Sequence, residues 1–321
     1  MPLTITEIEE AKKRIAPYIV ETPLIRLQNL DSYLGCKVYA KLESLQKTGS
    51  FKLRGAVNKL LTLSREQLVD RGIVAASSGN HGKALSYAAG LLGVKCTIVM
   101  PRTAPQNKID AIGKLGAEVV LCETSERFKI ADEICRERGC TMAPPFDDYE
   151  IMAGQGTAGL EIFAQCPELD CVISPVSGGG LLGGVSAALK ARSGGRIRVV
   201  GAEPELLPHY RQSLAAGERV TVPQQLTVAD ALVSQTPGVK NFPVVAANTD
   251  EVVCVSEEYI KKGMKLMLTE GKLLAEPASC IGAGALLEGR VKVREDEKVC
   301  LLISGGNVSF ERLEILKDVN I

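Results

Sequence analysis

Three short segments combine glycine with hydroxyl or amide side chains, and each follows an apolar run and precedes a helical pattern. They are SSGNHG (77–82), SGGGLLGG (177–184) and SGGN (304–307). In parallel α/β sheets such turns gather at the carboxyl edge of the strands, where ligands bind. The glycines at 178–180 lack side chains, so their backbone N–H groups can surround a phosphate at a helix start. The first segment offers hydroxyl, amide and imidazole groups, which suit a carboxylate.

The middle segment also fits a different ligand. Gly178, Gly180 and Gly183 satisfy G-x-G-x-x-G, and Glu203 lies about 20 residues further on, as in a dinucleotide site. That motif is weak when it stands alone, and here two other ligand-binding turns accompany it. One phosphate and one carboxylate fit the three turns better than a pyrophosphate does. We therefore favour a phosphorylated cofactor with a small carboxylate substrate over NAD.

The composition indicates a globular protein of one large domain or two modest ones. The 321 residues are 45% hydrophobic, and Lys plus Arg and Asp plus Glu balance at 38 each, which favours neither a nucleic-acid surface nor a membrane surface. The N-terminal segment lacks the apolar run of a signal peptide, and no stretch is long enough to span a membrane, so we expect a cytoplasmic protein. The ten cysteines contain no C-x-x-C pair and only two histidines accompany them, so we expect reduced core thiols and no zinc site.

Strands and helices are expected to alternate along most of the chain. Apolar runs such as IVAA, CTIVM and EVVLC are separated by helical patterns that end near Gly93, Gly116 and Gly139. Pro105 and Ser125 are expected at the starts of two of these helices, and residues 204–248 are expected to be connecting structure. Strands that alternate with helices in this way form βαβ units and parallel sheets. The sequence therefore predicts an α/β protein with two parallel-sheet domains, helices on both faces of each sheet, and a cleft between the domains.

The segment TGSFKLRGA contains Lys52, which is unremarkable by itself. Together with its neighbours, however, the chain resembles the fold-type II pyridoxal phosphate enzymes, in particular the group of serine racemases and serine/threonine dehydratases. The stretches that carry the resemblance are KLESLQKTGSFKLRGA, SSGNHG, AGQGT, PVSGGGLL, EPAS and ISGGN, in the order of the family. The resemblance implies a tryptophan synthase β-like fold with a large cofactor-binding domain (1–71 and 148–321). It also implies a small domain (72–147) that carries the substrate-carboxylate loop.

The resemblance assigns the cofactor, pyridoxal 5'-phosphate, to named residues. Lys52 corresponds to the lysine that binds the cofactor as a Schiff base, and Phe51 to the residue that packs against its ring. Asn80 corresponds to the partner of the ring oxygen, and Ser304 to the partner of the pyridine nitrogen. The phosphate loop corresponds to Gly178, Gly179, Gly180 and Leu181.

The chemistry that the resemblance implies is consistent with these residue types. An amine condenses with an aldehyde and can then move the α-proton, and burial lowers its pKa, which helps both steps. The cofactor is an electron sink. The neutral hydroxyl of Ser304 cannot hold the pyridine nitrogen protonated, which favours loss of the β-hydroxyl over transamination. The implied activity is a lyase reaction, elimination of water and ammonia from L-threonine or L-serine to give 2-oxobutanoate or pyruvate, in a homodimer or higher homo-oligomer.

The substrate loop leaves a second activity open. By the resemblance Ser77, Asn80 and His81 receive the substrate carboxylate. Ser78 stands where racemases have the serine that exchanges a proton on the face opposite the lysine, although some dehydratases carry it too. Serine racemisation with dehydratase side activity is therefore the alternative function. A non-catalytic amino-acid-binding relative is a third reading, which the intact Lys52 disfavours.

A divalent cation is doubtful. Glu203 matches the first cation ligand of eukaryotic serine racemases, but His209 falls where those enzymes have an aspartate. Hard cations such as Mg²⁺ prefer oxygen ligands. We therefore expect weak dependence on Mg²⁺ or none.

Overall fold

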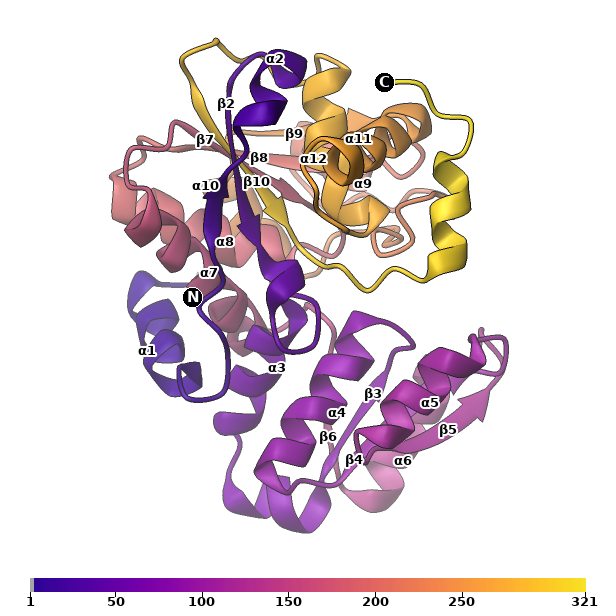
Figure 1. The fold of residues 1–321 in the computed structure, drawn as a ribbon. Helices are drawn as coiled ribbons and strands as arrows, with labels where there is room; N and C mark the ends of the chain where they lie inside the picture. Colours follow the sequence, from indigo (N-terminus) through magenta and orange to yellow (C-terminus); the bar gives the residue numbers. More distant parts are fainter. Residues whose placement is uncertain (1–2) are drawn as a thin grey trace.

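The computed structural model describes residues 3–321, so residues 1–2 at the start of the predicted large domain lie outside the described residues. Two sheets stand in separate lobes (Figure 1). The larger sheet has the strand order β1-β2-β10-β7-β8-β9. Its strands are β1 (Leu24–Arg26), β2 (Lys37–Leu42), β7 (Cys171–Pro175), β8 (Arg198–Pro204), β9 (Glu251–Val255) and β10 (Lys298–Ile303).

Strand residues of the larger sheet alternate between two hydrophobic cores, one on each face. In β10, Val299, Leu301 and Ile303 pack with α11 (Glu257–Thr269) and α12 (Pro277–Leu287), whereas Cys300 and Leu302 pack with α7 (Tyr149–Gln165) and α8 (Gly180–Ser193). The helices of this part of the chain are α1 (Ile5–Ile15), α2 (Asp31–Leu34), α3 (Lys52–Leu61), α7 (Tyr149–Gln165), α8 (Gly180–Ser193), α9 (His209–Ala216), α10 (Asn241–Asn248), α11 (Glu257–Thr269) and α12 (Pro277–Leu287). The sheet is therefore covered by helices on both faces.

The smaller sheet forms the lower lobe in Figure 1 and is parallel throughout, in the order β5-β4-β3-β6. Its strands are β3 (Ile73–Ala76), β4 (Cys96–Pro101), β5 (Glu118–Cys122) and β6 (Thr141–Met142), and its helices are α4 (Asn80–Leu92), α5 (Gln106–Lys114) and α6 (Arg127–Arg138). All of these elements fall between residues 72 and 147, while the domain limits themselves stay a prediction.

The predicted fold class is confirmed, with three local differences. The short edge strand β1 runs antiparallel to β2, a common addition to a parallel sheet. Residues 204–248 were expected to be connecting structure, which is wrong, because they contain α9 and α10. These helices have eight residues each, too few for a clear amphipathic period. Gly93 and Gly139 end their helices in the left-handed conformation as predicted, but Pro105 and Ser125 lie just before their helices rather than within them.

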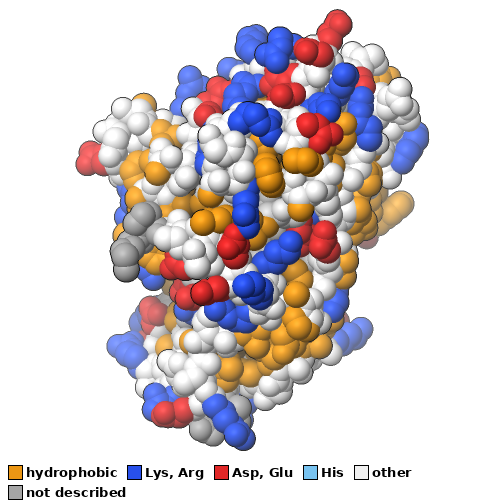
Figure 2. Space-filling model, turned by 90° about the vertical axis from the view of Figure 1, so that its left-hand side faces the viewer, with side chains coloured by type: hydrophobic (Ala, Val, Ile, Leu, Met, Phe, Trp, Pro, Cys, Tyr) orange, Lys and Arg blue, Asp and Glu red, His pale blue; other side chains and the backbone are white. Residues whose placement is uncertain are grey.

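The glycine-bearing turns all follow strands. SSGNHG follows β3, SGGGLLGG follows β7 and SGGN follows β10, each at the carboxyl end of its strand. Figure 2 shows positive and negative side chains interspersed on the face that it presents, as the balanced composition predicts. The ten cysteines, all within the described residues, are free thiols, and nine of them are buried. No helix in the described range is long and apolar enough to cross a membrane.

Candidate active site

Lys52 is the first residue of α3, and its side chain turns toward the segment that connects the smaller sheet to α7. Its Nζ atom donates a hydrogen bond to the carbonyl oxygen of Pro145 (2.6 Å) and lies 5.2 Å from the centroid of the Phe51 ring. Burial lowers the pKa of Lys52 to about 8. A larger fraction of the side chain is therefore neutral amine near physiological pH, which is the form that condenses with an aldehyde.

The loop at 178–180 connects β7 to α8 and presents backbone rather than side chains. Gly179 precedes the first helical residue and has φ +101°, a conformation that favours glycine. A Cβ built on Gly178 would lie 2.3 Å from the Phe146 ring, and one built on Gly179 would lie 1.9 Å from the Tyr210 hydroxyl. That hydroxyl donates to the carbonyl of Gly178 (3.1 Å), and Leu181 is buried in the first turn of α8. The loop therefore has the form of an anion site at a helix start.

Orphaned buried oxygen atoms lie next to two of the segments that would hold a cofactor, the start of α3 and the glycine loop. Thr48 Oγ1 and Ser50 Oγ, in the loop before Lys52, have no hydrogen-bond partner among the described residues, and neither does Asn241 Oδ1. Asn241 lies beside the glycine loop, since its Cβ is 3.0 Å from a Cβ built on Gly179. Buried polar atoms normally have partners. An amine, a backbone cradle and unpaired hydroxyls together fit a phosphorylated aldehyde such as pyridoxal phosphate.

The segment 77–82 joins β3 to α4. The hydroxyl of Ser77 accepts the N–H groups of Gly79 (3.4 Å) and Gly82 (3.2 Å), so it closes the loop on itself. His81 is buried, and its Nε2 lies 2.9 Å from the carbonyl oxygen of Ala143. Burial first, and then the charge of Lys52, lower the pKa of His81 to about 3. His81 is therefore neutral, and it contacts the same segment (143–145) that holds the Lys52 amine.

Asn80 belongs to a polar cluster that sequence reasoning missed. Its side-chain nitrogen donates to both carboxylate oxygens of Glu276 (2.9 and 3.0 Å), and its oxygen accepts from Asn307 (2.7 Å). Asn307 also accepts a hydrogen bond from Lys83 Nζ (2.8 Å). Glu276 is buried, which raises its pKa. The cluster ties the start of α4, in the small lobe, to the SGGN and EPAS motifs of the large lobe.

Ser304 lies beside Ser279, which sequence reasoning also left without a role. The two hydroxyl oxygens are 2.9 Å apart, and Ser279 Oγ accepts the N–H of Gly305 (2.8 Å). The carbonyl of Ser304 accepts the N–H of Phe51 (3.0 Å), so Ser304 lies next to the lysine segment. Glu276 and Ser279, the two residues missed, are the polar positions of the EPAS motif (276–279), which was their only signal in the sequence.

Ser78 and Glu203 stand apart from these contacts. Ser78 is half-buried in the same loop as Asn80, and its place opposite Lys52 stays a prediction. The buried Glu203 carboxylate accepts the N–H groups of Tyr210 (2.9 Å) and Arg211 (2.8 Å) and lies 3.2 Å from His209 Nδ1. In the part of the chain that is described, no group of three or more acidic, histidine or cysteine side chains could hold a metal ion.

Comparison with known proteins agrees with this geometry. A family model described as "Pyridoxal-phosphate dependent enzyme" matches residues 15–305. The chain is 40% identical to a serine racemase of Dictyostelium discoideum over 97% of both chains. It is 38% identical to an L-threonine ammonia-lyase of Geobacter sulfurreducens, covering 98% of this chain and 78% of that protein. The structure of maize serine racemase matches with a TM-score of 0.93 at 36% identity, covering 98% of this chain and 97% of the other.

Proposed function

Because this chain belongs to the family of pyridoxal-phosphate dependent enzymes, we propose that it eliminates water and ammonia from a small β-hydroxy amino acid, L-threonine or L-serine. The product is 2-oxobutanoate or pyruvate. The observation that carries the proposal is the Lys52 amine, held with a lowered pKa beside the Phe51 ring. Relatives of similar overall length are named for this elimination and for racemisation.

The chain's own residues have separate tasks in this proposal. Bound pyridoxal phosphate supplies an aldehyde for the lysine and an electron sink for the α-carbon. Lys52 binds that aldehyde and afterwards moves the α-proton of the substrate. The glycine loop holds the phosphate through backbone N–H groups, and Phe51 packs against the ring. Ser304 bonds the ring nitrogen, and the 77–82 loop binds the substrate carboxylate.

Racemisation of serine is the alternative, and the observation that favours it is Ser78. A racemase needs a second group that exchanges a proton on the face opposite Lys52, and Ser78 is half-buried in the substrate loop. Two of the similar proteins are named serine racemases. The proposed homo-oligomer, the domain limits and the substrate side chain stay predictions.

A substrate panel that scores two products separates these functions. L-serine, L-threonine and their D-enantiomers are incubated with the purified protein, and both keto-acid release and the chirality of recovered substrate are measured. Keto acid from L-substrate with unchanged chirality supports the lyase, and chirality that changes faster than keto acid appears supports the racemase. Turnover of neither kind, in a protein that carries the cofactor on Lys52, would contradict both.

Exchanging Ser304 for aspartate is expected to increase transamination relative to elimination. The Ser304 hydroxyl is neutral and lies against the Ser279 hydroxyl, whereas a carboxylate there would hold the ring nitrogen protonated. Pyridoxamine phosphate formed per keto acid released is the measurement. Ser304→Asn is the control, because asparagine has nearly the shape of aspartate but carries no charge. An unchanged ratio in the aspartate variant would contradict this account of reaction control.

Removal of divalent cations is expected to change activity and melting temperature little. The Glu203 carboxylate is already hydrogen bonded to two backbone N–H groups and paired with His209, whose imidazole is a poor ligand for hard cations. Dialysis against EDTA followed by assay and thermal melting tests this. A large loss that Mg²⁺ or Ca²⁺ restores would show that another group completes a cation site with Glu203.

A further inference from the structure

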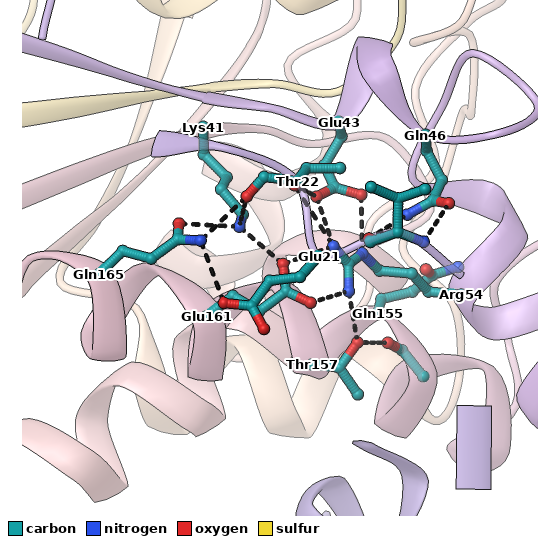
Figure 3. Close-up of polar contacts among 12 residues, drawn as sticks. Glu21, Thr22, Lys41, Glu43, Gln46, Arg54, Gln155, Thr157, Glu161 and Gln165 are labelled. Carbon is teal, nitrogen blue, oxygen red and sulfur yellow. Dashed lines mark hydrogen bonds and ion pairs between the residues drawn. The ribbon is translucent and has the colours of Figure 1, made fainter. Parts of the chain in front are cut away.

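Four buried charged side chains form a cluster that includes Arg54, in the first turn of α3 (Figure 3). Its members are Arg54, Lys41, Glu43 and Glu161, of which Glu161 is 2% exposed and the others 0%. Arg54 follows Lys52 by two residues, which is about 200° around an α-helix. The two side chains therefore leave α3 in nearly opposite directions. Two cations face two carboxylates, so the cluster is neutral as a whole.

Arg54 forms two forked pairs at once. Its Nε and Nη2 donate to the carboxylate of Glu43 (2.7 and 2.8 Å), and its Nη1 and Nη2 donate to that of Glu161 (2.6 and 2.7 Å). Nη1 also donates to the hydroxyl of Thr157 (3.1 Å). Two carboxylates that bond one planar guanidinium fix both its position and the orientation of its plane.

The two carboxylates are themselves held by other groups. Lys41 Nζ donates to Glu161 (2.6 Å) and to the carbonyl of Thr22 (2.6 Å), and the Thr22 hydroxyl donates to Glu43 (2.5 Å). Burial alone would raise the pKa of Glu43, but Arg54, Thr22 and Lys41 hold it below its usual range. Glu43 is therefore a carboxylate, and the forked pair with Arg54 is ionic.

The cluster joins the elements that surround Lys52. Glu43 directly follows β2 and begins the segment that contains Thr48 and Ser50 and leads to Lys52, the first residue of α3. Its pair with Arg54 therefore connects the two ends of that segment. Glu161 lies on α7, the helix that follows the Pro145 segment. Helices α3 and α7 touch closely here, because a Cβ built on Gly154 would lie 2.6 Å from the carbonyl of Arg54.

The start of α3 is not fixed by an ordinary cap. Phe51 occupies the N-cap position in helical conformation, and among the described residues no side-chain hydrogen bond caps the helix. Buried ion pairs often add little stability compared with apolar side chains of similar size. Stability is therefore a weak explanation for four buried charges at this place.

We propose that Arg54 is a positioning residue, which fixes the rotation and depth of α3 so that the Lys52 amine stands at the site. This inference rests on the proposed role of Lys52. Among the described residues, the guanidinium is hydrogen bonded to Glu43, Glu161, Thr157 and Thr22, none of which is a predicted cofactor or substrate residue, so it would act through the backbone of the first helical turn. A change at Arg54 should therefore move the amine without altering the glycine loop.

Arg54→Lys tests this proposal, because a lysine keeps the charge but cannot bond two carboxylates in fork geometry. We expect kcat to fall about 10- to 100-fold with little change in KM, since a small misplacement of a reacting group costs about that much. The second measurement needs no turnover. Full-length protein freed of cofactor is labelled with acetic anhydride across a pH series, and the Lys52 peptide is quantified by mass spectrometry. In the unaltered protein we expect half-labelling of Lys52 near pH 8. In Arg54→Lys we expect it to move toward pH 10.5, the pKa of an ordinary lysine.

Arg198→Lys is the matched control. Arg198 is the first residue of β8, so it lies at the amino ends of the parallel strands, whereas the glycine turns of the candidate site lie at their carboxyl ends. It pairs with Glu251 (3.3 Å) and Glu297 (2.9 Å). It should lose contacts with two carboxylates, as Arg54→Lys does but on a side chain that is 30% exposed, while leaving kcat and Lys52 labelling unchanged. Arg54→Lys behaving like Arg198→Lys in both measurements would overturn the proposal.

Two further outcomes are distinguishable. If Arg54→Lys does not fold, Thr157→Val removes the neutral bond to the guanidinium (3.1 Å) together with the bond from the Thr157 hydroxyl to the Gly154 carbonyl (2.7 Å), and leaves both ion pairs of Arg54 in place. We expect kcat to fall about two- to tenfold, with half-labelling of Lys52 shifted in the same direction. No change in Thr157→Val would then count against the proposal. If pyridoxal phosphate does not attach to Lys52 in the unaltered protein, the proposed function fails, while the labelling series still decides whether Arg54 positions the amine.

Discussion

Lys52→Ala protein is expected to lose keto-acid release and any racemisation by about 10⁴-fold or more, because one amine both binds the cofactor and moves the α-proton. The structure gives the half-buried Lys52 an amine with a lowered pKa, hydrogen bonded to the carbonyl oxygen of Pro145. Release of pyruvate or 2-oxobutanoate at saturating pyridoxal phosphate is the measurement. The loss should appear in kcat and should not be restored by more cofactor.

Lys47→Ala is the control for that experiment. Lys47 lies in the same loop, five residues before Lys52, but it is exposed. It should retain full activity and the same melting temperature. Substantial turnover by Lys52→Ala, or an equal loss in Lys47→Ala, would contradict the assignment of the amine.

Ser78→Ala is expected to separate elimination from racemisation. Elimination from an L-amino acid needs one base, Lys52, on one face of the cofactor plane, whereas racemisation needs a second proton-exchanging group on the other face. The variant should keep most elimination from L-substrate and lose racemisation and turnover of D-substrate. A side chain that acts in proton transfer contributes about 10²–10⁴-fold in rate, so the two activities should separate clearly. Keto-acid release and chiral analysis on both enantiomers give the result.

Ser77→Ala provides the comparison for Ser78. The Ser77 hydroxyl accepts N–H groups from Gly79 and Gly82 and so shapes the loop. Its removal should weaken both activities together. If Ser78→Ala also weakens both alike, Ser78 holds the loop or the carboxylate instead, and if racemisation is undiminished, Ser78 is not the second acid–base group.

Much of the framework was predictable because its signals are local. Each glycine turn directly follows its strand, the first two turns run directly into α4 and α8, and Gly93 and Gly139 directly follow the helices that they end. The helix expected after SGGN is wrong, because that turn is followed by the short 3-10 helix Phe310–Leu316. Alternation of such units predicts parallel sheets, and parallel sheets bring the turns to one edge. The α9 and α10 helices were missed because helices of eight residues are too short for a readable period.

The partners within the site were not predictable, since they are distant in sequence. Lys52 meets the carbonyl of Pro145, and Asn80 meets Glu276, across 93 and 196 residues. A backbone carbonyl carries no sequence signal, and the acidic residue of EPAS resembles any helix-start glutamate. Arg54 is visible in TGSFKLRGA, but a single arginine in a sequence is normally expected to be a solvated surface side chain. Nothing in the motif indicates that it is buried and paired with two carboxylates.

The most direct test of the account is to identify the residue that carries the cofactor. The purified protein, incubated with pyridoxal phosphate, is reduced with borohydride and digested, and the peptides are mapped by mass spectrometry. We predict a single pyridoxyl phosphate group on Lys52 and a visible absorbance band that disappears on reduction. Label on a different lysine, or a protein that acquires neither band nor label, would contradict the central claim.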